Sequence, residues 1–198
     1  MRSAIGRAAA VLFIVAAFAN PALAGKGPVV VSPMVFVPPA VFSQVDGPQV
    51  LNAATTDQIV QSLEAAKNFC AGIGGAYSVD CLAERMAATA AAMPDTGQYA
   101  PAKAAIADAA DKLHALARQN AATDLPRVRA SQGETRTTRP IIPVAPAAQP
   151  AVNAQAAAIL DEAATVLLRS ADSDPVLGAD YTQIAAAVGS NKVLLRST

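Results

Sequence analysis

The chain has few of the residues from which most enzyme sites are built. Its 198 residues include no tryptophan, one histidine and two cysteines, and aromatic residues make up 4% of the chain. With one histidine, the chain has no histidine cluster for a zinc site. The sequence also contains no C-x-x-C or C-x-x-C-H motif. We therefore expect no metal, no covalent haem and no other cofactor.

The common motifs of nucleophilic and nucleotide chemistry are also missing. No G-x-S-x-G elbow occurs, and the glycine-rich stretch 72–75 is not followed by the Lys-Ser/Thr of a phosphate loop. His114 follows Asp111 by one turn of a predicted helix, where the two could act as an acid–base pair. A helix residue beside a carboxylate is the simpler interpretation. We expect no catalytic residues, and we interpret acidic residues such as Glu84 as part of solvated faces.

The first 24 residues have the pattern of a secretory signal peptide. Arg2 and Arg7 precede the apolar stretch 8–19, and Ala22-Leu23-Ala24 forms a small-residue cleavage site before Gly25. An uncleaved anchor is the alternative, but twelve apolar residues are too few for a bilayer, which needs about 20. The chain contains 49 alanines, a bias common in bacteria with GC-rich genomes. We therefore expect a bacterial protein that is periplasmic or secreted.

Cleavage at this site would leave a nearly neutral chain. Two of the fifteen basic residues are removed, so the formal net charge becomes −2. A chain with little net charge lacks a strong electrostatic field and is not expected to bind nucleic acid. No later segment is expected to span a membrane after signal cleavage. Four arginines between residues 127 and 139 could touch anionic envelope polymers, although charges this sparse are typical of a solvated linker.

Residues 25–50 form a segment that is apolar and rich in proline. Its prolines exclude a helix or a central strand, so we expect an extended arm. An apolar arm is poorly suited to free solvent, and it would lie either on the protein's own helices or on a partner. The residues expected to dock on such an envelope partner are Val35, Phe36, Val37 and Phe42.

Residues 55–121 show helical periodicity in three blocks. The first helix is predicted over about 56–70, with Thr55 and Gln58 as a capping box. Pro94 ends the second helix, and Ser78 is expected to cap its start. The predicted inward positions of the three helices are Ile59, Leu63, Ala66 and Cys70; Val79, Leu82, Met86, Ala90 and Met93; and Tyr99, Ala102, Ile106, Ala109, Leu113 and Leu116.

Cys70 and Cys81 lie at the facing ends of the first two predicted helices. An even cysteine count in an exported protein favours a disulfide, which would join the helices into an antiparallel hairpin. On the chain-entropy estimate, such a short loop contributes roughly 3 kcal/mol. Redox activity or metal binding by the two cysteines is the alternative.

The second half of the chain divides into a linker and a helical pair. Residues 122–150 contain five prolines and lose the helical period, which predicts a flexible linker. Residues 151–198 are expected to form two helices that pack back on the first three. The predicted inward positions of the pair are Val152, Ala156, Ile159, Ala163, Val166, Leu167, Tyr181 and Ile184.

One short stretch resembles a known repeat. Gly97-Gln98-Tyr99, followed by Ala102, Ile106 and Ala109, is similar to the second helix of a tetratricopeptide repeat. The preceding helix lacks the larger residues of that family, and no second copy occurs at its period. We interpret the stretch as close helix packing.

These patterns together predict an all-α fold, a small disulfide-stapled helical bundle with an extended N-terminal arm and a Pro-rich internal linker. For function we expect a non-enzymatic interaction or scaffold role in the cell envelope. A carboxylate-dependent hydrolase of envelope polymers is one alternative, and it needs a cleft with two acids about 5 to 10 Å apart. A carrier of small apolar ligands is the other, and it needs a pocket of about 300 Å³ or more.

Overall fold

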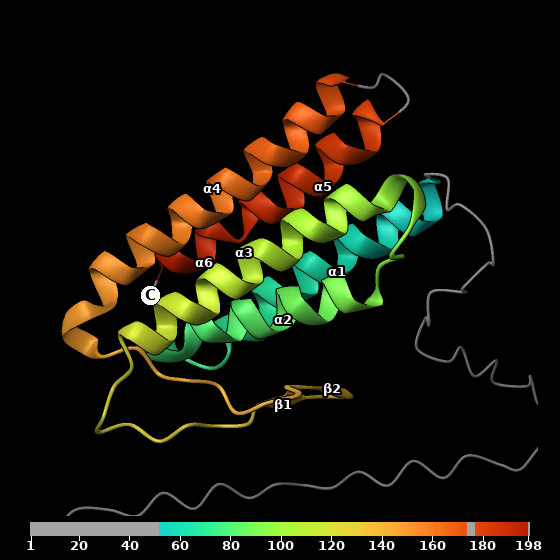
Figure 1. Ribbon diagram of the computed structural model, residues 1–198. Helices are drawn as coiled ribbons and strands as arrows, with labels where there is room; N and C mark the ends of the chain where they lie inside the picture. The colour runs from blue at the N-terminus through green and yellow to red at the C-terminus, as the bar shows by residue number, and fades with distance from the viewer. Residues whose placement is uncertain (1–51, 174–176, 198) are drawn as a thin grey trace, which may run out of the picture. The chain divides into compact units, whose positions relative to one another are not determined.

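The computed structural model describes residues 52–173 and 177–197. Figure 1 shows helices running side by side, with one short hairpin beside them. The predicted signal peptide, residues 1–24, and the predicted arm, residues 25–50, lie outside the described residues.

The fold is all-α, which confirms the prediction. Six α-helices are described, and the connections contain three single-turn 3₁₀ helices and a two-stranded hairpin. The elements are α1 (Ala53–Ala71), η1 (Gly75–Tyr77), α2 (Ser78–Ala92), η2 (Gly97–Tyr99), α3 (Ala100–Gln119), β1 (Ser131–Gln132), β2 (Thr135–Arg136), η3 (Pro146–Ala148), α4 (Gln149–Ser173), α5 (Gly178–Ser190) and α6 (Lys192–Arg196).

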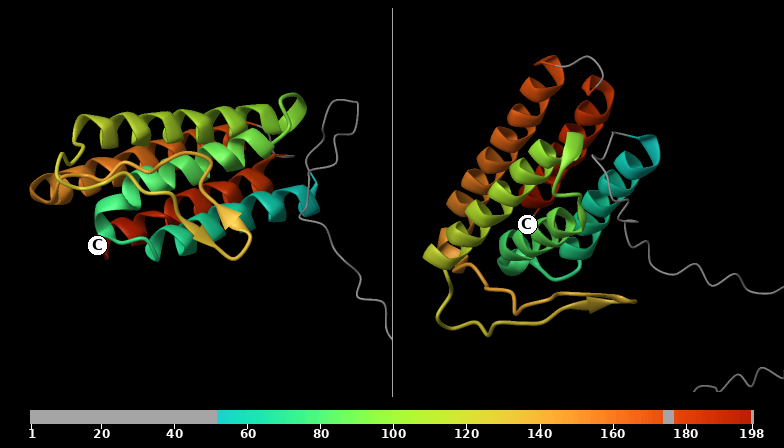
Figure 2. Two further views of the ribbon diagram at one scale, coloured as in Figure 1. Left: turned by 90° about the horizontal axis from the view of Figure 1, so that it is seen from below. Right: turned by 45° about the vertical axis from the view of Figure 1, so that its right-hand side comes forward.

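The five long helices pack side by side, and the last contacts the first. Helices adjacent in sequence pack together from α1 to α5, and α5 also packs against α1 (Figure 2). Every inward position predicted for the first three helices is buried. Buried alanines such as Ala102 and Ala156 let the helix backbones approach closely, and larger side chains such as Tyr99 fill the space between the helices.

The first helix begins earlier than predicted. Asn52 caps α1 by accepting a hydrogen bond from the Thr55 N–H at 2.9 Å, so Thr55 is not the cap. The hydroxyl of Tyr99, which is fully buried, accepts from the Asn52 N–H at 2.9 Å and donates to its carbonyl oxygen at 3.0 Å. A residue 47 positions away therefore fixes where α1 starts. Ser78 is likewise the first residue of α2, not its cap.

Helix α4 buries most of the face that the sequence predicts, with differences at three positions. Leu160 is fully buried, whereas Ile159 lies at the edge of the core and Val166 is 43% exposed. The predicted positions Val152, Ala156, Ala163 and Leu167 are buried. The inward face is set by α3 and α5, which pack on α4 from two sides.

Among the described residues, one helical stretch, Pro146–Asp172, is long and apolar enough to cross a membrane, with a mean hydropathy of 1.2. The sequence alone predicted no such stretch after the signal peptide. The stretch packs along α3 and α5, and the Lys112 and Lys192 side chains pair with Glu162 and Asp161 on its surface. A core helix of a bundle has the same length and composition, so the stretch is weak evidence for a span.

The prediction of a flexible linker over residues 122–150 is wrong. Most of this segment forms an ordered strap, residues 120–145, that runs beside α2 (Figure 2). Ile141 and Val144 in the strap are 0% and 1% exposed. Its proline content marks loss of helix, but a chain without helix can still be fixed by tertiary contacts.

Candidate functional site

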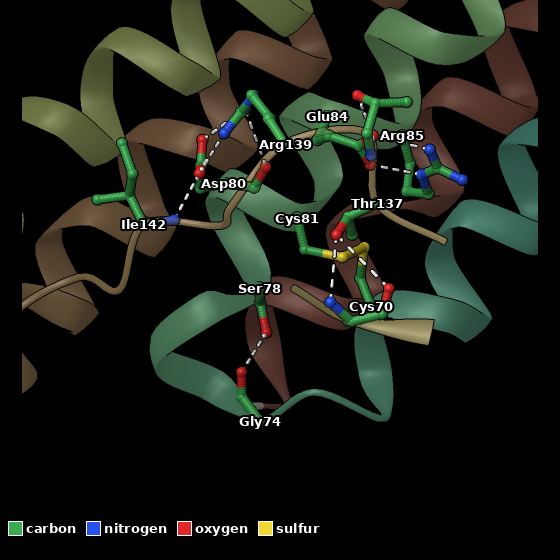
Figure 3. Close-up of a disulfide and its surroundings, with 12 residues drawn as sticks. Cys70, Gly74, Ser78, Asp80, Cys81, Glu84, Arg85, Thr137, Arg139 and Ile142 are labelled. Carbon is green, nitrogen blue, oxygen red and sulfur yellow. Dashed lines mark hydrogen bonds and ion pairs between the residues drawn. A yellow bond between two sulfur atoms is a disulfide. The ribbon is translucent and has the colours of Figure 1, made fainter. Parts of the chain in front are cut away.

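The disulfide between Cys70 and Cys81 is present, as predicted. Its Cα atoms are 5.7 Å apart, and both residues are 0% exposed. It joins the end of α1 to the first turn of α2 across a ten-residue connection (Figure 3). Disulfides persist in oxidising compartments, so the bond indicates an environment outside the cytoplasm.

Asp80 precedes Cys81 on α2 and forms the centre of a buried ionic cluster. Its carboxylate is 0% exposed. One oxygen accepts from Arg139 at 2.8 Å and from His114 Nδ1 at 2.7 Å. The other accepts from Arg139 at 2.6 Å and from the Ile142 backbone N–H at 2.6 Å. Figure 3 shows Arg139 and Ile142 of the strap at this carboxylate on α2, and His114 joins α3 to the same group.

The surroundings of Asp80 favour its ionised form. Burial by itself raises the pKa of the carboxyl, because it removes water from the charge. Hydrogen bonds from Arg139, His114 and the Ile142 N–H, together with the Arg139 charge, outweigh burial and leave the pKa of Asp80 below its ordinary value. An ionised carboxylate only accepts hydrogen bonds, so His114 Nδ1 carries the shared proton.

Glu84 lies one turn further along α2 and makes a second link to the strap. Its Oε1 accepts from the Thr138 N–H at 2.7 Å and the Thr138 hydroxyl at 2.9 Å. Arg85 donates to both oxygens, at 2.6 and 2.8 Å. Burial raises the pKa of Glu84, but the hydrogen bonds from Arg85 and Thr138 lower it by more than burial raises it. The pKa of Glu84 therefore lies below its ordinary value. The expectation that Glu84 is solvated is wrong, because its side chain is 2% exposed.

This pair of carboxylates is arranged for structure. The acid of a glycosidase needs a raised pKa and an oxygen that can reach a substrate. Asp80 and Glu84 have lowered pKa values, and all four of their oxygens already accept hydrogen bonds from the protein. These two residues therefore do not offer the free proton donor on which the hydrolase alternative depends.

His114 does not pair with Asp111 as the sequence suggested. Its partner is Asp80, 34 residues earlier in the chain. A histidine oriented by a buried carboxylate resembles the base of a catalytic triad. However, the groove described below is not lined by His114. The histidine is 33% exposed and joins α3 to the carboxylate that holds the strap.

A half-open groove of about 480 Å³ lies between α1, α2 and the hairpin of the strap. Its helical sides carry mostly small side chains, and Gln132 and Thr135 form the hairpin side. These two residues are directly opposed in the hairpin, so their side chains share one face. The residues that line the groove are Ser62, Ala65, Ala66, Asn68, Phe69, Arg85, Ala88, Thr89, Ala92, Gln132 and Thr135.

Arg85 is the single charged residue in the groove lining. Its guanidinium lies 5.6 Å from the centre of the Phe69 ring, a distance typical of a cation–π contact. Two of its five N–H groups donate to Glu84, and the side chain is 14% exposed. The Glu84 charge offsets that of Arg85, so the groove favours an uncharged surface with hydrogen-bond acceptors.

Sequence reasoning found the disulfide but missed the ionic cluster. The predicted docking residues Val35, Phe36, Val37 and Phe42 lie outside the described residues. Asp80 and Arg139 are 59 residues apart, and the one local signal was the i, i+4 spacing of Asp80 and Glu84.

Comparison with known proteins adds nothing to these observations, since no family, no curated protein and no solved structure matches the chain.

Proposed function

We propose that this chain is an exported, non-enzymatic interaction or scaffold protein of the bacterial cell envelope. The observation that supports the proposal is the groove between α1, α2 and the strap hairpin. Three separate segments form this surface, and the strap that supplies its outer side is fastened by two buried carboxylates. Irregular backbone that is held in place by buried charged groups is typical of a preformed recognition surface.

The proposed location rests on two features. The N-terminal 24 residues have the composition of a signal peptide, and the buried disulfide fits an oxidising compartment. Export to a bacterial periplasm or to the medium accounts for both. Mass spectrometry of the native protein tests this, because we expect the mature chain to begin at Gly25 with both cysteines oxidised.

A second contact region is proposed for the arm. Val35, Phe36, Val37 and Phe42 would present apolar side chains to an envelope protein. Deletion of residues 25–50 is expected to weaken the complex with that protein.

Photo-crosslinking in living cells tests the role of the groove. A photoreactive residue replaces Ala65, which is exposed in the groove, or Ala154, which is exposed on α4 away from it. We expect a defined crosslinked protein from position 65 and none from position 154. The variant Ala88→Leu, which fills the groove, should abolish this product, whereas Ala87→Leu on the exposed side of α2 should not. Equal products from positions 65 and 154 would contradict the proposal.

The size of the groove also keeps a ligand carrier as a second candidate. Its volume of about 480 Å³ lies within the range of small-molecule sites. Six of its eleven lining residues are polar or charged, which favours a ligand with polar groups over a wholly apolar one. Native mass spectrometry of the protein purified from its own envelope distinguishes this candidate, since a carrier should retain a small molecule that Ala88→Leu excludes.

A further inference from the structure

The two ends of the strap are hydrogen-bonded to each other. The Ala122 N–H donates to the Pro143 carbonyl at 2.8 Å, and the Ala145 N–H donates to the Asn120 carbonyl at 2.9 Å. Ala121 and Val144 form the bridge between the two ends. Val144 at the joined ends is buried in the core of the helices, so the ends stay in place. The segment between them can move away without displacing α3 or α4.

The middle of the strap covers the disulfide. Val128, Ala130 and Ile141 pack in one apolar cluster with Cys70 and Cys81. Leu194 of α6 belongs to the same cluster and covers it from the C-terminal helix. Both cysteines are 0% exposed, so a reductant in solution cannot touch the sulfur atoms while the strap stays in place.

Polar contacts are a large share of what holds the strap. Buried side chains in it are confined to Thr137 and residues 141–144, and its hairpin, residues 131–136, is exposed. Arg139 and the Ile142 N–H bind Asp80, and Thr138 binds Glu84. A segment with few buried apolar side chains opens at a lower free energy than the helices around it.

The groups that face the two carboxylates come from three elements. Asp80 faces Arg139 of the strap and His114 of α3. Glu84 faces Arg85, which lies on its own helix. A neutral group in place of the Asp80 carboxylate would leave at least one of its donors, such as the buried Ile142 N–H, without an acceptor.

We propose that the part of the strap between its joined ends, residues 123–142, is a latch over the Cys70–Cys81 disulfide, which opens as a unit while the helices remain folded and so controls the access of reductants to the bond. The carboxylates of Asp80 and Glu84 hold the latch closed. The disulfide thus stays oxidised in the presence of thiols because it is covered. This inference concerns the protection of the bond and does not depend on the proposed partner.

The test uses the purified full-length chain and the phosphine reductant TCEP at neutral pH, with free thiols alkylated and counted by mass spectrometry. The wild-type disulfide should be reduced faster than the globally unfolded fraction allows, because local opening suffices. Amide exchange should give the N–H groups of Val128, Ile141 and Ile142 one shared protection factor, lower than that of central α3 amides. Reduction only at the rate of global unfolding, or strap amides as protected as α3, would overturn the proposal.

Variants separate the latch from general destabilisation. Asp80→Asn should raise the reduction rate at least about tenfold, and by more than it raises exchange at central α3 amides. Thr138→Val removes one hydroxyl bond to Glu84 and provides a milder variant if the Asp80→Asn protein does not fold, with an expected increase of about two- to fivefold. Glu162→Gln on the exposed face of α4 is the matched control and should leave the rate unchanged. Equal rates in all four proteins would contradict the latch.

Discussion

Replacement of Asp80 by asparagine tests whether one buried carboxylate holds α2, α3 and the strap together. Asparagine keeps the size of the side chain but turns one acceptor oxygen into a donor. The four groups that donate to Asp80 come from Arg139, His114 and the Ile142 backbone. At least one of them would then face another donor in a site that water does not reach.

The expected loss is large for a single isosteric change. Removing one partner of a buried ion pair costs about 3–5 kcal/mol, because the remaining charge stays buried without compensation. Arg139 is 32% exposed, so its guanidinium can partly recover solvent, and we place the loss in unfolding free energy near the lower end, at about 3 kcal/mol. This is a substantial part of the total stability of a small domain, which is about 5–15 kcal/mol.

Urea unfolding at pH 7, followed by circular dichroism, measures this loss. Asp161→Asn is the matched control, because Asp161 is 57% exposed and pairs with Lys192 at the surface. Its expected effect is within about 0.5 kcal/mol. The m-value should not change between the proteins, so that the midpoints report stability.

A double-mutant cycle shows whether the loss comes from the ionic cluster. Arg139→Gln in the Asp80→Asn background should cost much less than it does alone, because its partner is already gone. A loss below about 1 kcal/mol for Asp80→Asn, or strictly additive effects of the two changes, would refute the reasoning.

Three further predictions follow from other contacts. Folding lowers the pKa values of Asp80 and Glu84, so their contribution to stability is complete above the unfolded pKa values of about 4 and is lost as pH falls through the folded values. Urea midpoints should therefore drop below about pH 4, and a midpoint that does not change with pH would contradict this. Replacing Cys70 and Cys81 together by serine should cost roughly 3 kcal/mol in thermal unfolding, and no loss would contradict it. Tyr99→Phe should cost about 1–2 kcal/mol and speed amide exchange in the first turn of α1, whereas unchanged exchange would show that the hydroxyl does not anchor that turn.

Local sequence determined the helices and the disulfide. Apolar residues such as Leu82, Ile106 and Leu113 recur at helical spacing, so the side of the helix that must leave water can be identified without a structure. The cysteines lie at facing helix ends separated by a short connection, which restricts their pairing. These features depend on residues that are close together in the sequence, so the spacing of apolar residues and cysteines is enough to predict them.

Tertiary structure alone decided the rest. The face of α4 that is buried includes Leu160 and leaves Val166 exposed, because α3 and α5 approach that helix from particular sides. The strap is ordered through Arg139 and a carboxylate 59 residues away, and the groove exists because this strap lies beside α1 and α2. Proline and arginine content describes only how a segment behaves in water. Whether that segment becomes fixed depends on buried charges elsewhere in the chain that need its donors.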